Sequence, residues 1–233
     1  MTTRRQIKEL AAPLLARHAD LALVKDTIVI RPVNHLLNFI LIERTGNVDT
    51  CEPRWGTAIL FQWLGDLPIG ATRLLYRWGP LRRWSWSDPT MIQSFVEAAE
   101  NEVLPKLRAV RTLRDYWDKV PTHDPEQLIY EWHKLLMCSL ALGWLDRTKA
   151  LLEQNPRVHG KEWGVNFVRT LDEHSGGLGT RLLERGDRLE RADRLKFAED
   201  LHEMEASSVK NLGLEKIWVR TEFPIESAGA SGR

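Results

Sequence analysis

Residues 73–86 form a short segment, rich in arginine and tryptophan, whose residue types best fit ligand chemistry. The candidate binding residues are Arg73, Arg77, Arg82, Arg83, Trp84 and Trp86, with Tyr76 and Trp78 between them. No acidic residue lies between Asp66 and Asp88. Arginine beside aromatic rings is typical of surfaces that stack on bases or hold phosphate groups. The segment therefore indicates a binding surface for a partner or a ligand.

The same tryptophans can also be packing residues. The chain has 10 tryptophans against 6 phenylalanines, so tryptophan is in use throughout. Burying one tryptophan removes about 150–250 Å² from water, which is worth about 4–6 kcal/mol at about 25 cal/mol per Å². Packing in the core or at a sheet edge is the commoner use of such rings. The exposure of Trp84 and Trp86 decides between the two interpretations.

Motifs for catalysis, cofactors and metals are weak. The glycine-rich stretch 174–180, HSGGLGT, lacks the Lys-Ser/Thr pair of a phosphate-binding P-loop. The densest group of metal-ligand types is His123, Asp124, Glu131 and His133. Two of these, Glu131 and His133, lie two residues apart on a predicted helix and so point in different directions. We predict no cofactor and no metal site, name no catalytic residue, and lean towards a protein that is not an enzyme.

The composition is that of an ordinary globular protein. The chain has 233 residues, 43% of them hydrophobic and 28% charged, which is enough for a real core. Its net charge is +1, so no long-range field draws in nucleic acid or an anionic membrane. Cys51 and Cys138 are too few for a disulfide scaffold and too far apart for a zinc motif. With no secretion signal and no apolar run long enough for a bilayer, we expect a cytoplasmic protein without membrane contact.

Hydrophobic periodicity places these features on a mixed fold. Residues 4–20 carry an apolar stripe at helical spacing, and short segments rich in Ile, Leu, Val and aromatic residues follow. The predicted strands are 21–31, 35–44, 56–64 and 71–78. Short turns between them favour antiparallel pairing. Because LLNFILI at 36–42 is apolar on both faces, we expect that strand to be central and covered on both sides.

From Asp88 onward the pattern is helical. Asp88 and Asp124 are each followed by proline and are predicted helix N-caps. Residues 181–205 read as a highly charged helix, and its predicted i,i+4 ion pairs are Glu184 with Arg188, Asp187 with Arg191, and Glu190 with Arg194.

The fold class we predict is α+β. We expect an N-terminal helix plus a four- to five-stranded antiparallel sheet in a domain of residues 1–118. A helical region over 119–225 packs on this domain, and residues 226–233 form a flexible tail.

Residues 87–117, SDPTMIQSFVEAAENEVLPKLRAVRTLRDYW, carry a family resemblance. A helix ending in LPKL, followed by a short TLRDY helix, resembles the close of some uncharacterised bacterial α+β domains. The similarity covers roughly residues 1–120. It implies a helix and a β-meander before this helix, and it supplies no catalytic residue because those families have no established activity.

Two functions follow from these observations. The first is a non-enzymatic cytoplasmic module that binds another protein, of the adaptor or toxin-immunity kind. The surfaces that it would use are the charged helix 181–205 and the Arg/Trp segment 73–86. The alternative is binding of nucleic acid or of a phosphorylated small ligand through 73–86.

Overall fold

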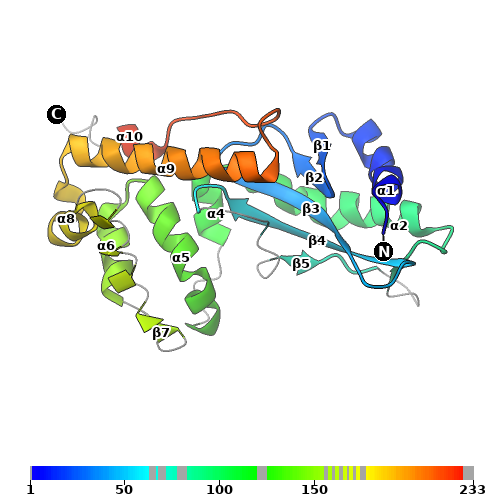
Figure 1. The fold of residues 1–233 in the computed structure, drawn as a ribbon, viewed down its shortest axis with the longest axis horizontal. Helices are drawn as coiled ribbons and strands as arrows, with labels where there is room; N and C mark the ends of the chain where they lie inside the picture. The colour runs from blue at the N-terminus through cyan, green and yellow to red at the C-terminus, as the bar shows by residue number, and fades with distance from the viewer. Residues whose placement is uncertain are drawn as a thin grey trace. The chain divides into compact units, whose positions relative to one another are not determined.

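The computed structural model describes most of the chain (Figure 1). The chain falls into two compact units. The described residues are 2–62, 67, 72–77, 83–119, 125–154, 157–158, 161–162, 165–166, 168–169, 172–173 and 177–227. Unit 1 comprises Met1–Leu60, Leu64–Thr112 and Val209–Arg220, and unit 2 comprises Phe61–Trp63, Leu113–Ser208 and Thr221–Arg233. The segment Val209–Arg220 thus belongs to the sheet-containing unit although it follows the helical region. The division at residue 118 and the packing of the helical region on the sheet domain stay predictions.

Unit 1 is built on an antiparallel sheet, which confirms the predicted α+β class. Its strands are β1 (Leu21–Val24), β2 (Thr27–Ile30), β3 (Leu36–Arg44), β4 (Thr50–Ile59), β5 (Arg73–Leu74) and β6 (Trp84–Ser85). The order is β1-β2-β3-β4-β5, and β6 also pairs with β4 (Figure 1). The long pair β3–β4 runs in register from Leu36 opposite Ile59 to Arg44 opposite Cys51. Short connections join β1 to β2, β2 to β3 and β3 to β4, and these four strands form the expected meander.

Three strands differ from the sequence-based expectation. Of the strand predicted over 71–78, only β5 (Arg73–Leu74) is a strand within the described residues 72–77. Residues 21–31 form two strands, because Lys25 takes a left-handed backbone conformation (φ 54°) and turns the chain into a hairpin. Strand β4 begins at Thr50 and contains Pro53, which the sequence indicates as a turn. Ile42, opposite this proline, directs its N–H away from β4 to the Asp26 carbonyl, so the Ile42–Pro53 pair exchanges no hydrogen bonds. Proline is tolerated there because its missing N–H breaks no bond between β3 and β4.

One face of the sheet is covered by α1 (Arg4–Arg17), α2 (Met91–Ala98), the π-helical turn η2 (Ala99–Val103) and α3 (Leu104–Arg108). A capping box at Thr3 starts α1, and the apolar stripe predicted for it is buried. The residues of that stripe are Ile7, Leu10, Ala11 and Leu14. They form one core with residues of β3, β4, α2 and α3.

The other face carries a second, smaller core. Val29, Leu37 and Phe39 of the sheet meet Val209 and Leu214, which come from near the other end of the sequence. Central strand β3 is therefore covered on both faces, as its two-sided apolar pattern predicts. This second core leaves part of its apolar wall open at β1 and β2.

Unit 2 is mainly helical. Its elements are α4 (Leu113–Lys119), α5 (Pro125–Ala141), α6 (Leu145–Gln154), the hairpin β7 (Arg157–Val158) and β8 (Lys161–Glu162), α8 (Leu178–Arg185), η3 (Gly186–Arg188), α9 (Arg191–Leu212) and α10 (Pro224–Ser227), with the end of α9 in unit 1. Trp132, Leu136 and Phe197 are among its fully buried side chains. Among the described residues, none of the helices combines the length and apolar composition that a membrane span requires.

The charged segment 181–205 is not one helix. It breaks at Gly186, whose positive φ and following 3₁₀ turn separate α8 from α9. None of the three predicted i,i+4 ion pairs forms within the described residues 177–227, because their members do not share a continuous helix. Other ion pairs stabilise the segment instead: Arg181 with Asp193, Arg185 with Glu190, and Lys196 with Asp200.

Candidate functional site

Trp84, a candidate binding residue, is a core residue. Strand β6 pairs Trp84 with Cys51 of β4, and the side chain is only 3% exposed. Its ring packs edge-on against Phe95 with centroids 5.8 Å apart, and its Nε1 donates to the Leu75 carbonyl at 2.7 Å. Both the ring and its N–H are therefore engaged inside unit 1, which favours the packing interpretation of this residue.

Arg77 is engaged in the same way. Its buried guanidinium forms an ion pair with Asp88 and donates to the Thr90 hydroxyl at 2.8 Å. The guanidinium also lies 5.9 Å from the centroid of the Trp84 ring. The Thr90 backbone N–H and the Arg77 guanidinium hold the pKa of Asp88 below its ordinary value. Arg77 thus fastens the segment to the start of α2.

The other described residues of the predicted segment differ in exposure. Trp86 is partly buried, and its Nε1 donates to the Thr2 hydroxyl at 3.1 Å. Arg73 is exposed and lies 5.5 Å from the ring centroid of Trp55. Arg83 is exposed and lines a cavity, whereas Arg82 lies outside the described residues. A binding role for segment 73–86 stays a prediction that rests, in the described part, on Arg73 and Arg83.

Unit 2 contains an arginine–tryptophan grouping that sequence reasoning missed. We call Arg114, Trp117, Trp144 and Arg147 the Arg–Trp cluster. The two rings meet edge to face, with centroids 5.3 Å apart and an interplanar angle of 88°. The guanidinium carbons of Arg114 and Arg147 each lie 4.8 Å from the Trp144 ring centroid. Both arginines are exposed and both rings are partly exposed.

Two local structures position the cluster. Helix α4 places Arg114 and Trp117 one turn apart on the same face. Trp144 follows Gly143, whose positive φ (73°) ends α5, and its N–H donates to the Ser139 carbonyl at 2.9 Å. The Trp144 carbonyl then accepts from the Thr148 N–H at 2.9 Å, which starts α6 and places Arg147 beside the ring. The turn between α5 and α6 therefore fixes half of the cluster.

The two arginines differ in their electrostatic partners. Arg114 forms an exposed ion pair with Asp118 at 3.3 Å. Arg147 has no carboxylate within ion-pairing distance in the part of the chain that the structure describes. A guanidinium held against a ring keeps its N–H edge available for a carboxylate. Arg147 is thus a positioned, exposed cation whose hydrogen-bonding edge can serve an incoming group.

A sequence signal for this cluster exists but is weak. Arginine and tryptophan recur three residues apart, as RDYW at 114–117 and WLDR at 144–147. Each spacing puts the two side chains on one helical face. The two pairs lie far apart in sequence, so nothing in the sequence alone brings them together.

Groups suited to catalysis are not assembled in the described residues. No group of three or more His, Cys, Asp or Glu side chains there could hold a metal ion. Burial lowers the pKa of His133, which keeps its imidazole neutral. Cys51 and Cys138 are free and buried.

Both thiols are expected to be inert in the folded protein. Burial raises the pKa of Cys51 and of Cys138 to about 12 in each case, so neither supplies thiolate near neutrality. At pH 8 a maleimide should label neither residue until denaturant is added. The same shifts lower stability as the pH rises above the unfolded thiol pKa of about 8.5, because only the unfolded chain then loses these protons. Rapid labelling of the native protein at pH 8, followed by mass spectrometry, contradicts this.

Comparison with known proteins gives no further guide to this geometry. No protein-family model, curated protein or solved structure shows significant similarity to the chain.

Proposed function

We propose that the chain is a non-enzymatic, cytoplasmic protein-binding module of the adaptor or toxin-immunity kind, and that the Arg–Trp cluster contacts its partner. The observation that carries this proposal is the exposed Arg147 guanidinium, held against Trp144 with no carboxylate partner in the described chain. Tryptophan and arginine are the residue types that most often dominate binding energy at protein interfaces. A partner that presents a carboxylate among apolar groups complements this surface.

The charges around the cluster favour a protein partner over nucleic acid. The same helices, α4 and α6, also carry Asp115, Asp118 and Asp146. Affinity for nucleic acid comes mainly from many cations that neutralise phosphates. A surface of mixed charge around two aromatic rings repels phosphates as well as attracting them, whereas it suits the core and rim of a protein interface.

Affinity capture with matched variants tests the proposal. Wild-type protein, Arg147→Glu and Arg4→Glu are each immobilised and exposed to nuclease-treated native lysate of the cells that express the chain. Arg4 is an exposed arginine of α1 that makes no ring contact and no ion pair within the described residues, and it lies outside the surfaces named for a partner, so it controls for charge alone. We expect one protein to be retained by the wild type and the control but lost with Arg147→Glu, and to rebind after purification. Equal retention of that protein by all three immobilised proteins contradicts the proposal. So does a parallel capture from untreated lysate in which the wild type retains nucleic acid and no specific protein.

A second observation supports the alternative function, binding of a phosphorylated small ligand or nucleic acid through segment 73–86. Arg83 lines a cavity of about 340 Å³, together with Thr45, Thr50 and Tyr76. Tyr76 is 68% exposed, so its ring is free to contact a base. If a nucleotide binds there, Arg83→Ala should weaken binding about tenfold, since a charge-assisted hydrogen bond is worth about 1.5–3 kcal/mol. Tryptophan fluorescence titrated with nucleoside triphosphates and oligonucleotides measures this, and an unchanged spectrum for all of them removes the alternative.

A further inference from the structure

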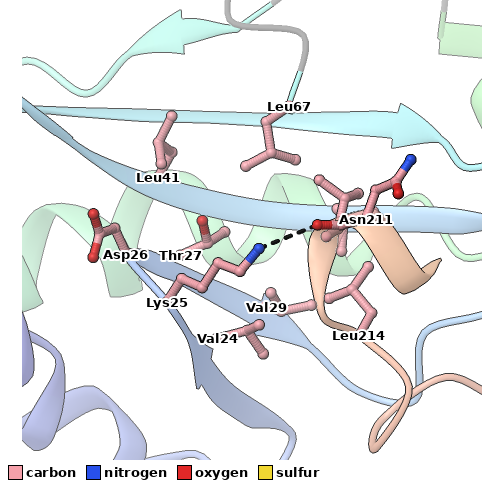
Figure 2. Close-up of a pocket in the computed structure, with 11 residues that line it drawn as sticks. Val24, Lys25, Asp26, Thr27, Val29, Leu41, Leu67, Asn211 and Leu214 are labelled. Atoms are coloured by element: carbon pink, nitrogen blue, oxygen red, sulfur yellow. Dashed lines mark hydrogen bonds between the residues drawn. The ribbon is translucent and has the colours of Figure 1, made fainter. Parts of the chain in front are cut away.

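An open cavity of about 320 Å³ lies on the second face of the sheet in unit 1 (Figure 2). Small-molecule sites typically have volumes of about 300–1,000 Å³ and mostly apolar walls. The walls of this cavity come from β1, β2, β3, the end of α9 and the residue Leu67. The apolar residues that line it are Val24, Val29, Leu37, Leu41, Leu67, Leu212 and Leu214. The cavity therefore has the size and lining of a site for a compact organic molecule.

Lys25 is the cation of this cavity. It occupies the first turn position of the β1–β2 hairpin with φ 54°, a conformation that glycine adopts far more readily. Its side chain crosses to the end of α9, where Nζ donates to the Asn211 carbonyl at 3.1 Å, as Figure 2 shows. At Gly213, which ends the helix with φ 76°, a Cβ atom would lie 3.4 Å from Lys25 Cε. Lysine at a backbone position suited to glycine costs conformational energy. A role for the lysine charge explains why that cost is tolerated.

Capping the helix uses only one of the three donors of the ammonium group. Lys25 has no carboxylate partner in the part of the chain that the structure describes. Its neighbour Asp26 is occupied, because Arg44 binds both of its oxygens at 2.9 and 3.1 Å. The mouth of the cavity therefore keeps one positive charge that pairs with no acidic side chain among the described residues.

Thr27 adds a second donor on the same side. The residue is only 7% exposed, lines the cavity and makes no hydrogen bond through its hydroxyl within the described residues. Lys25 and Thr27 flank Asp26 at the hairpin turn (Figure 2). The polar groups free to serve a ligand are thus an ammonium and a hydroxyl at one side of an apolar chamber.

We propose that this cavity binds a small organic acid with an apolar body, with its carboxylate held by Lys25 and Thr27. A carboxylate accepts from both donors at once, and charge-assisted hydrogen bonds are the stronger kind. The carbonyls at the end of α9 disfavour an anion by themselves, so the site depends on the Lys25 charge. An alcohol of equal length leaves that charge unpaired, and an amine places two cations together. The inference does not depend on the proposed protein partner.

Titration with three eight-carbon probes tests the site. Octanoate, octanol and octylamine are added to the full chain, and binding is followed by two-dimensional NMR. We expect octanoate to bind, with shifts at residues that line the cavity, and the alcohol and amine to bind about tenfold more weakly or not at all. Equal binding of octanol and octanoate, or shifts only elsewhere in the protein, overturns the proposal.

Two variants separate the charge from the cavity. Lys25→Gly removes the ammonium but fits the left-handed backbone, so the protein should keep its melting temperature and bind octanoate about tenfold more weakly. Lys8→Gln, an exposed lysine of α1, is the control and should bind octanoate as the wild type does. Leu41→Trp fills the chamber and should abolish binding. If Lys25→Gly binds octanoate as the wild type does, the proposal is overturned. Phosphatidylserine vesicles serve as a separate probe, and a protein that binds these vesicles but not free octanoate also overturns it.

Discussion

Replacing Trp84 by alanine is expected to lower the free energy of unfolding by about 3–5 kcal/mol, the usual cost of truncating a buried large aromatic residue. The side chain is 3% exposed, packs edge-on against Phe95 and donates to the Leu75 carbonyl. Its removal leaves a cavity in the first core and an unpaired carbonyl. Urea denaturation measures the change as a lower transition midpoint at constant slope.

Two further variants make the Trp84 result specific. Trp84→Phe keeps a ring beside Phe95 but loses the N–H, so it should cost less than the alanine variant. Trp86→Ala should also cost less, because Trp86 is only partly buried and its N–H bonds a threonine hydroxyl. If the Trp84→Ala protein is as stable as the wild type, the Trp84 ring is not part of the core. Trp84 is then again a candidate binding residue.

Arg147→Glu is expected to weaken partner binding about tenfold or more while lowering stability by no more than about 1 kcal/mol. A positioned guanidinium that pairs with a partner carboxylate contributes about 1.5–3 kcal/mol, and reversal of its charge adds repulsion. The residue is exposed and forms no ion pair in the described chain, so the folded state loses only its contacts with the Trp144 and Trp117 rings. Isothermal calorimetry with the captured partner gives the dissociation constant, and thermal unfolding gives the stability.

The conservative variant Arg147→Lys separates the contribution of the positive charge from that of the planar guanidinium. Lysine keeps the charge but lacks the planar guanidinium that lies against a ring and binds a carboxylate with two donors. We expect Arg147→Lys to bind with intermediate affinity and Arg4→Glu to bind as the wild type. Identical affinity of wild type and Arg147→Glu excludes the cluster as the contact surface.

The sequence predicts the fold where periodicity and packing agree. The stripe of α1 and the two-sided apolar run of β3 both correspond to buried residues, because hydrophobic pattern and burial have the same cause. The β1–β2 hairpin is not predictable in this way, since lysine gives no signal for the left-handed conformation of Lys25. Pro53 lies within β4 because its position needs no N–H, a fact of register that only pairing reveals.

The candidate site is less predictable because it depends on contacts between distant residues. Residues 67–87 contain no acidic residue, a pattern that indicates an anion-binding surface. In the structure, however, Arg77 pairs with Asp88, the next acidic residue in the sequence. The Arg–Trp cluster arises from two separate segments that tertiary structure brings together. Residue types alone identify the chemistry, whereas exposure and partners decide whether it is available.

Hydrogen–deuterium exchange of the captured complex tests the central claim most directly. Amide protection on binding reports which elements the partner covers or rigidifies. We predict that binding slows exchange in α4 and in the turn and first residues of α6 that contain Trp144 and Arg147. Unchanged exchange in both of these elements, with protection confined to segment 73–86 or to any other part of the chain, contradicts the account.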